Sequence, residues 1–477
     1  MRWPRRSPSI PLGTHGLPFL ARSLRLRGDE AKSHVYVIGK TGSGKSRWLA
    51  SLYVNILKAG YSATLIDPHG DLAQLVLRQL VATGYFDSEA AYNRLLYLDI
   101  PAAARRNRYL RFNCLSQPYD THTTTRLMLD AMRRAFPSLA GGVAPAFEQI
   151  LTAGTHVLVE HGLSFPRLRD LLVKPEWRDH LLSTVRDELV RSFFRDEYDQ
   201  WTIRERQTNQ GSTMRRLFLL LYNPILRHAL GATDNLLEYR SILDQNRSLI
   251  VNLAVPDPDT KRLLGCLLTV FAEHGALSRA DLPPEERPTT PHFLILDEFH
   301  LFVAQSSETL TGMLSETRKY NEFLVLSHQT RGQVPERLQA ALQNVEVEVI
   351  FRIGREDAEH AAKDVGAVDP LLVKHQQEDE QAAERGHPAF YSLQEQWEAH
   401  TERLTTQPKR TAIVRHPDGS ITQVRSPHFP DPTYDPAVLR NVEEHYLTAC
   451  FAEPRQEPTL VFPNESDGRP RRRIRVA

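Results

Sequence analysis

Residues 35–46 constrain the fold of this chain more than any other stretch of its sequence. Val35–Ile38 is a run of four apolar residues, rich in β-branched side chains, and it predicts a short buried strand. Gly39–Ser46 follows at once with the spacing G-x-x-x-x-G-K-S, and residues 47–57 carry apolar side chains at helical intervals. A strand, a glycine loop and a helix in this order are the context that a phosphate-binding loop requires. The stretch therefore predicts an α/β fold that binds a nucleoside triphosphate.

The predicted loop would hold phosphates mainly through its backbone. Glycines let successive N–H groups turn inward around a β-phosphate, and the helix N-terminus adds partial positive charge. Lys45 would reach the β- and γ-phosphates, and the Ser46 hydroxyl would take one Mg²⁺ position. An ordinary glycine turn before a helix is the alternative, but every motif residue and both flanks are present. ATP and Mg²⁺ are therefore expected, with the nucleotide held by Gly39, Lys40, Thr41, Gly42, Ser43, Gly44, Lys45 and Ser46.

A second apolar run, residues 293–296, ends in the acidic pair Asp297 and Glu298. In a phosphate-loop NTPase, Asp297 would hold the hydration shell of the Mg²⁺, and Glu298 would orient and deprotonate the attacking water. An acidic pair at the end of a strand more often caps a helix, so the pair is weak evidence alone. Combined with the upstream glycine loop, it predicts the second half of a hydrolytic site.

Length and composition indicate a soluble globular protein with room for two or three domains. The chain has 477 residues, of which 41% are hydrophobic and 25% charged. Its longest apolar runs, such as 217–222, are far shorter than the ~20 residues that a membrane span needs. Prolines interrupt the N-terminus, which argues against a signal peptide. Three widely separated cysteines form no metal-ligand pair and favour a reducing, cytoplasmic setting; they are Cys114, Cys266 and Cys450.

Strand and helix patterns divide the chain into an α/β part and a helical part. Strand-like runs alternate with helical patterns up to about residue 117, then vanish, and resume near residue 248. Between them, amphipathic helical patterns follow one another, the last over 213–227. The predicted organisation is an irregular basic N-terminal segment (1–30), an α/β ATPase domain in two parts (31–117 and 236–430), an all-α insertion (118–235) and a C-terminal extension with a basic tail (431–477).

Arginines are concentrated at the two ends of the chain, although the formal net charge is only +1. Residues 1–27 contain six arginines and no acidic residue. The last nine residues contain Arg469, Arg471, Arg472, Arg473 and Arg475. Such termini can bind nucleic-acid phosphates or anionic lipid, and they also occur as plain solvated tails, so both interpretations stay open.

The motifs, taken in order, resemble those of the HerA–FtsK superfamily, and more closely its type IV secretion coupling-protein branch. The matching segments are the glycine loop, residues 67–71, 113–115 and 296–299, and the motifs at 318–320, 327–329 and 351–358. This resemblance extends over roughly residues 30–400. It implies a RecA-like P-loop NTPase core with a central, mostly parallel sheet, interrupted by an all-α domain. It also implies a homo-oligomeric ring, commonly a hexamer, that encircles DNA.

The same resemblance implies roles for individual residues. Lys45 and Ser46 match the Walker A motif, and Asp297 and Glu298 match Walker B. Gln329 matches the polar residue that senses the γ-phosphate. Arg318 matches an arginine offered to the neighbouring subunit's nucleotide; Arg352 and Arg355 are weaker candidates for that role, since structural ion pairs explain them equally simply. Membrane-embedded coupling proteins usually begin with transmembrane helices, and no such helix is predicted here.

Two functions remain open on the sequence. The first is an ATP-driven DNA translocase, acting in DNA transfer or processing, with a secretion or relaxase-type protein partner. The second is a nucleotide-dependent adaptor ATPase that recruits protein cargo to a secretion or defence complex. Either would be cytoplasmic, with membrane association only through partners. The sequence does not distinguish single- from double-stranded DNA, the polarity of movement or the biological pathway.

Overall fold

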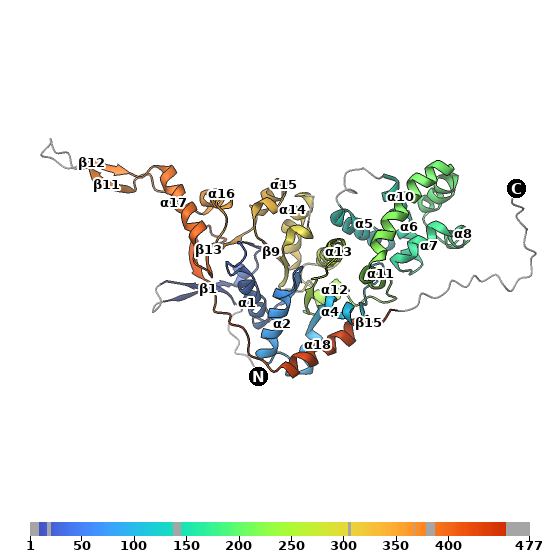
Figure 1. Cartoon of the computed structure of the whole chain (residues 1–477), viewed down its shortest axis with the longest axis horizontal. Helices are drawn as coiled ribbons and strands as arrows, with labels where there is room; N and C mark the ends of the chain where they lie inside the picture. Colours follow the sequence, from blue (N-terminus) through green and yellow to red (C-terminus); the bar gives the residue numbers. More distant parts are fainter. Residues whose placement is uncertain are drawn as a thin grey trace, which may run out of the picture. The chain divides into compact units, whose positions relative to one another are not determined.

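The computed structural model describes residues 9–16, 21–136, 145–303, 307–366, 368–377 and 387–454 of the chain (Figure 1). These residues form two compact units. The first lies within Met1–Arg106, Asp130–Val143 and Leu236–Phe451, and the second within Asn107–Leu129, Ala144–Asn235 and Ala452–Ala477. Two distant parts of the sequence thus build the first unit, with most of the second inserted between them. The exact boundaries of the five predicted segments stay a prediction.

The first unit is built on a sheet of eleven strands in the described residues. Seven neighbours run parallel in the order β10-β3-β9-β8-β4-β7-β5. They are β3 (Val35–Ile38), β4 (Ser62–Asp67), β5 (Leu95–Asp99), β7 (Ser248–Asn252), β8 (His292–Asp297), β9 (Glu322–His328) and β10 (Val347–Ile350). Most of these strands are buried along their whole length, as parallel strands covered on both faces must be. The predicted α/β fold with a mostly parallel central sheet is confirmed.

Four antiparallel strands extend this sheet beyond β10 in the order β13, β14, β1 and β2. Their bounds are β1 (Ser9–His15), β2 (Arg22–Arg27), β13 (Thr411–Arg415) and β14 (Ile421–Arg425). Gly419, at φ +80°, lies in the turn between β13 and β14, where the sequence predicted a hairpin. Smaller strands are β6 (Tyr109–Leu110), β11 (Val373–Gln377), β12 (His387–Phe390) and β15 (Phe451–Ala452).

The prediction of an irregular N-terminal segment over residues 1–30 was wrong for its described part. Residues 9–15 and 22–27 form β1 and β2, which pair with each other. Ile10 and Leu12 are fully buried, so burial of alternate side chains holds β1 in the sheet. Pro11 is tolerated because the register shifts between Pro11 and Gly13, and such irregularities are where strands accept proline.

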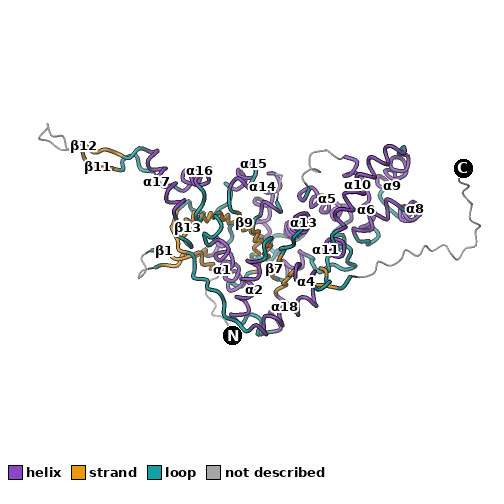
Figure 2. The backbone as a smooth tube through the Cα atoms, viewed as in Figure 1, coloured by secondary structure: helices purple, strands orange, loops and turns teal. Residues whose placement is uncertain are grey.

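Helices surround the strands of the first unit (Figure 2). They are α1 (Lys45–Lys58), α2 (Asp71–Ala82), α3 (Glu89–Arg94), α4 (Ile100–Arg105), α12 (Tyr239–Asp244), α13 (Pro258–Leu277), α14 (Ser307–Glu316), α15 (Glu336–Leu342), α16 (Arg355–Val365), α17 (Leu393–Thr406) and α18 (Pro436–Cys450). α1 is anchored by Trp48 and Tyr53, both buried and both donating hydrogen bonds to backbone carbonyls. This anchoring fixes the helix that follows the glycine loop.

The second unit is helical. Its helices are α5 (Thr121–Ala135), which continues into the first unit, α6 (Pro145–Glu160), α7 (Leu168–Val173), α8 (Pro175–Leu182), α9 (Glu188–Ser192), α10 (Ile203–Tyr222) and α11 (Pro224–Leu230). The helix predicted over 213–227 is in fact two helices. Pro224 cannot continue α10, and Asn223 accepts a hydrogen bond from the Ile225 N–H to begin α11.

Two further predictions concern the ends and the membrane. The arginines of the last nine residues lie outside the described part of the chain, so the basic tail stays a prediction. Among the helices that the structure describes, none is both long enough and apolar enough to cross a bilayer.

Candidate nucleotide-binding site

Three neighbouring parallel strands bring the predicted site residues together. β9 lies between β3 and β8, and the register pairs Ile38 with His328 and Ser327 with Asp297. Because parallel strands end at the same edge of a sheet, the glycine loop after β3 lies beside the acidic pair after β8. The motif at residues 327–329 lies between them. The predicted juxtaposition of the loop and the acidic pair is therefore observed.

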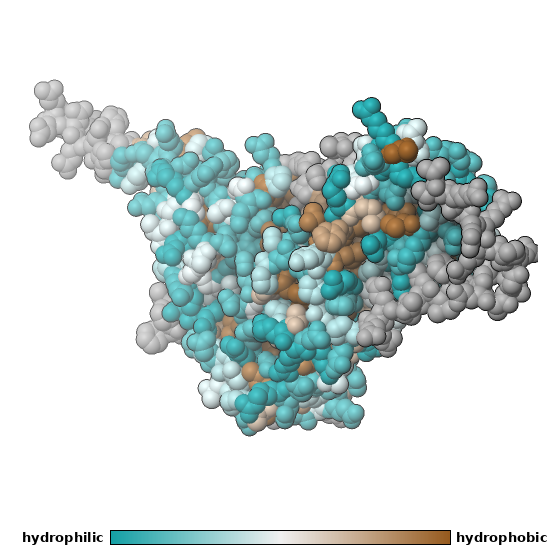
Figure 3. Space-filling view, turned by 45° about the vertical axis from the view of Figure 1, so that its right-hand side comes forward, coloured by the Kyte–Doolittle hydropathy of each residue, from teal (hydrophilic) through white to brown (hydrophobic). Residues whose placement is uncertain are grey.

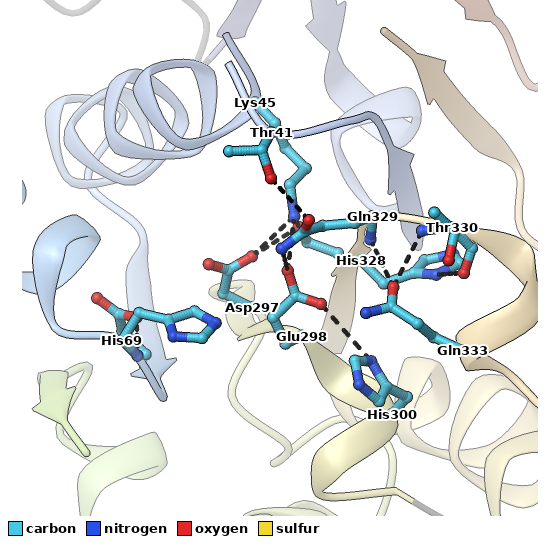
Figure 4. A network of polar contacts seen from close by, with 12 residues as sticks. Thr41, Lys45, His69, Asp297, Glu298, His300, His328, Gln329, Thr330 and Gln333 are labelled. Atoms are coloured by element: carbon cyan, nitrogen blue, oxygen red, sulfur yellow. Dashed lines mark hydrogen bonds and ion pairs between the residues drawn. The ribbon is translucent and has the colours of Figure 1, made fainter. Parts of the chain in front are cut away.

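Lys45 is the centre of this arrangement (Figure 4). Its Nζ lies 3.2 Å from Asp297 Oδ1 and 3.4 Å from Glu298 Oε1, and it donates to Ser327 Oγ at 3.0 Å. Ser327 in turn donates to the same Asp297 oxygen at 2.8 Å. The lysine is 6% exposed and the two acids 5% and 3%. One buried cation thus holds two buried carboxylates at the mouth of the loop.

Gln329 links the acidic pair to the loop. Its Nε2 donates to Glu298 Oε1 at 2.8 Å, and its Oε1 accepts from the Thr41 hydroxyl at 2.8 Å (Figure 4). Its own backbone N–H donates to Gln333 Oε1 at 3.1 Å, which fixes the turn after β9. A side chain that touches both the loop and the predicted base is well placed to sense what the loop holds.

The glycine loop has the backbone geometry of a phosphate cradle. Gly42 and Gly44 have φ values of +78° and +112°, which side chains rarely permit. A Cβ on Gly39 would lie 2.6 Å from Phe351 Cβ, so this position is also closed to larger residues. Ser43 Oγ is buried and has no hydrogen-bond partner among the described residues. An unpaired polar atom in a positively charged cradle fits a phosphate ligand.

Glu298 is held in a strained position. Its φ and ψ of 50° and 48° lie in the left-handed region, which is uncommon for a residue with a side chain. Its Oε2 is buried, has no hydrogen-bond partner, and lies 3.6 Å from His300 Nδ1. Burial lowers the pKa of His300, although the Glu298 carboxylate opposes this shift. A carboxylate with one oxygen unpaired is available to accept a proton from water.

Sequence reasoning missed two residues behind Gln329. His328 Nδ1 lies 2.8 Å from the Thr330 carbonyl, and its Nε2 lies 2.6 Å from the Tyr36 hydroxyl. A carbonyl can only accept, so Nδ1 carries the proton and Nε2 accepts from Tyr36. Burial lowers the pKa of His328 to about 3, so its ring stays neutral. Both residues carry ordinary apolar-strand patterns in the sequence, and only the register shows that they meet.

Asp67 was predicted to belong to a polar turn, and it is the residue that begins α2. Its carboxylate accepts from the backbone N–H groups of His69 (2.8 Å) and Ala73 (2.9 Å). Asp71, which the sequence suggested as the cap, is instead the first residue of the helix, and Gly70 precedes it in a left-handed conformation. Burial raises the pKa of Asp67, and the neighbouring Asp297 adds to this shift.

The three candidate arginines lie outside this network. Arg318 belongs to a short 3₁₀ helix, Thr317–Tyr320, immediately before β9, and it bonds to Glu346. It therefore lies at the edge of the sheet opposite the glycine loop, about 20 Å away along the seven residues of β9. Arg355 bonds to Glu359 and Glu398 on the surface. Only Arg352 lies beside the loop, where its carbonyl accepts from the Lys40 N–H at 2.9 Å.

Comparisons with known proteins agree with this geometry. Residues 21–113 match the family model of the central domain of helicase HerA. Two solved structures of the bacterial conjugative coupling protein TrwB, one unbound and one in complex with ADP and Mg²⁺, are each 17% identical to the chain. The TM-scores are 0.54 and 0.53, the matches cover 86% and 85% of this chain, and they cover 89% and 88% of those chains.

VirB4 of Thermoanaerobacter pseudethanolicus is similar as well, at 15% identity and a TM-score of 0.53, over 88% of this chain and 96% of that one. No curated protein matches the sequence significantly. The shared feature is the RecA-like fold with a P-loop. The resemblance to HerA–FtsK P-loop ATPases, and to conjugative coupling proteins in particular, is thereby confirmed.

Proposed function

We propose that this protein is an ATPase motor of the type IV secretion class, which hydrolyses Mg²⁺–ATP and moves DNA. One observation carries the ATPase part of the proposal. Lys45, Asp297, Glu298 and Gln329 come from three distant parts of the sequence and meet in one hydrogen-bonded network. The complex of TrwB with ADP and Mg²⁺ supports ATP and Mg²⁺ as the ligands.

The residues present fit such a ligand. Mg²⁺ is usually held by one or two protein oxygens together with phosphate and water, which matches Ser46 and Asp297. Bound there, Mg²⁺ would neutralise charge on the phosphate oxygens. Lys45 would turn from the acidic pair to the phosphates, which frees the Glu298 carboxylate. Glu298 would then take a proton from the attacking water, held in orientation by Gln329.

The motor part of the proposal concerns assembly and DNA. Arg318 lies too far from the loop of its own subunit to contact that subunit's nucleotide, which supports a role in the neighbouring subunit of a ring, commonly a hexamer. Within the first unit, the edge strand β2 presents Arg22 and Arg27 to solvent. Exposed arginines on an edge strand suit contacts with DNA phosphates, which need no base recognition. Strandedness, polarity and pathway stay open, as do the cytoplasmic location and association with the membrane through partners.

The test is the ATPase rate with and without DNA. Wild-type rings should hydrolyse ATP faster when single- or double-stranded DNA is added, and the Glu298→Gln variant should bind ATP without cleaving it. DNA affinity should fall steeply with salt and depend little on base sequence. Equal rates with and without either DNA would reject the translocase and leave the ATPase intact.

A second function is favoured by a surface of the helical unit. A groove of about 680 Å³ is lined by residues of α10 and its neighbours. Phe218 and Tyr222 on its rim are 64% and 71% exposed, and hydrophobic side chains are visible among polar ones where Figure 3 turns this side forward. Such patches are typical of protein-binding sites. In an adaptor that recruits protein cargo, a secretion or relaxase-type protein, and not DNA, would stimulate the ATPase.

A further inference from the structure

A C-terminal segment of the first unit touches the glycine loop on its outer side. The backbone N–H of Arg410, the residue before β13, donates to the Ser43 carbonyl at 2.8 Å. A Cβ on Gly44 would lie 3.2 Å from Arg410 Cα and 3.3 Å from its Cγ. The N–H of Ser426, directly after β14, donates in turn to the Arg410 carbonyl at 2.7 Å. Arg410 is thus held by the backbone against the loop.

The same segment covers the first turn of α1. Arg47, one residue after the predicted Mg²⁺ ligand Ser46, donates from Nη1 to the Phe429 carbonyl at 2.7 Å. Its Nη2 pairs with Asp431 at 2.7 Å. Residues 426–431 therefore pass beside the start of α1, adjoining the loop at Ser43 and Gly44.

These contacts lie where a nucleoside would leave the loop. The acidic pair and Gln329 mark the γ-phosphate end of the site, since they would act on the bond that is cleaved. A triphosphate that crosses the loop from there ends with its α-phosphate at the first turn of the helix. The ribose and base must then continue past Gly44 and Arg47, toward Arg410 and the residues after β14.

Arg410 and His428 present flat polar groups at this place. Arg410 Nη1 lies 3.2 Å from His428 Nδ1, and Nη2 donates to the Pro427 carbonyl at 3.2 Å. The histidine is exposed and the arginine half-buried. Arg410 has a φ of 69°, a left-handed conformation that is uncommon outside glycine and is often found at ligand sites. A guanidinium plane stacks well on aromatic rings, including nucleobases.

We propose that Arg410 and His428 form the nucleoside side of the site, with the Arg410 guanidinium stacked on the base of the bound nucleoside triphosphate. This inference rests on the proposed binding of ATP at the glycine loop. It assigns to the antiparallel extension of the sheet a role in ligand recognition, next to the parallel strands that carry the chemistry.

The decisive variant is Arg410→Gly. Glycine keeps the N–H that bonds to Ser43 and adopts the φ of 69° without strain, so only the side chain is lost. His428→Ala removes the neighbouring ring. Arg425→Ala is the matched control, because Arg425 is an exposed arginine on the adjoining strand β14.

The affinities for Mg²⁺–ATP and for inorganic tripolyphosphate with Mg²⁺ separate the two halves of the site. Arg410→Gly should weaken ATP binding about 10-fold, the order expected for one base stack, and leave tripolyphosphate binding unchanged. Arg425→Ala should change neither. Equal losses for both ligands would overturn the inference, because Arg410 would then only support the loop, and so would unchanged ATP binding. A wild-type protein that binds tripolyphosphate but not ATP also rejects it, whereas one that binds neither rejects the proposed function itself.

Discussion

At the scale of single residues, the site is dominated by one buried lysine shared between two carboxylates. Removing one partner from a buried ion pair leaves charge without compensation, which costs about 3–5 kcal/mol. Lys45→Ala should therefore lower the thermal midpoint of the ligand-free protein and also abolish ATP turnover, because the contact to the γ-phosphate is lost. Calorimetry and a phosphate-release assay measure the two effects. Lys58→Ala, at the other end of α1, is the control; wild-type turnover in Lys45→Ala would show that the site is misassigned.

A second residue prediction concerns Glu322, at the start of β9. Its side chain is fully buried, and neither carboxyl oxygen has a hydrogen-bond partner in the described part of the chain. Burial raises its pKa from 4.5 to about 8, with Glu273 adding to the shift and Arg279 opposing it. The folded protein thus prefers the protonated acid.

The sign of the pH dependence follows from that preference. Between pH 4.5 and about 8 the folded state binds a proton that the unfolded state has lost, so this group's contribution to stability falls as the pH rises, by up to about 1.4 kcal/mol per pH unit. Glu322→Gln stays neutral and should gain stability relative to wild type across this range. Denaturant unfolding of both proteins at pH 5 and pH 8 measures the difference. A constant difference would mean that Glu322 is ionised in the folded state.

At the scale of elements, α13 supports the loop that follows the Walker B strand. Gly265 on this helix faces the ring of Phe302, and a Cβ there would overlap the ring atoms. Phe302 is fully buried, so it has little room to move. Gly265→Ala should destabilise the protein by about 1–3 kcal/mol.

Gly312→Ala in α14 is the matched control for that change. A Cβ at Gly312 would meet no atom within 4 Å, so alanine should be neutral or stabilise the helix by about 0.5–1 kcal/mol. Thermal unfolding of the two variants compares the effect of packing with that of helix propensity. Equal shifts in the same direction would show that the contact with Phe302 has no energetic weight.

The elements that the sequence predicted correctly are those whose pattern is local. The strand and loop at 35–46, the run before Asp297 and the hairpin around Gly419 depend on neighbouring residues alone. β1 and β2 were missed because their stability comes from pairing with β14, far along the chain, which no local pattern reveals. The break in the helix over 213–227 was visible at Pro224, but the apolar periodicity outweighed it.

At the scale of the whole molecule, what the sequence could not predict is which side chains meet. Motif resemblance implied roles for Lys45, Glu298 and Gln329, but Ser327 and the pair of His328 and Tyr36 follow only from the register of β3, β9 and β8. The placement of Arg410 against the loop likewise depends on strands that join the sheet from the opposite end of the sequence. Long-range pairing therefore completes a site of which local patterns predicted the core.

The position of Arg318 yields the last prediction, which concerns assembly. This arginine lies at the sheet edge opposite the glycine loop and bonds to Glu346 through a half-exposed side chain. If it serves the neighbouring subunit, Arg318→Ala should reduce turnover by about 10³–10⁵, the range known for arginines supplied in trans. ATP binding should stay unchanged, because no contact within the subunit is lost.

Mixing subunits distinguishes this role from a structural one. Arg318→Ala and Glu298→Gln proteins should each be nearly inactive, but mixed rings contain some interfaces with an intact base and an intact arginine. Turnover should therefore reappear and pass through a maximum as the mixing ratio changes. Arg355→Ala, whose ion pairs with Glu359 and Glu398 are exposed, serves as the comparison arginine. Rings that form at every ratio and never regain activity would show that Arg318 does not act across the subunit boundary.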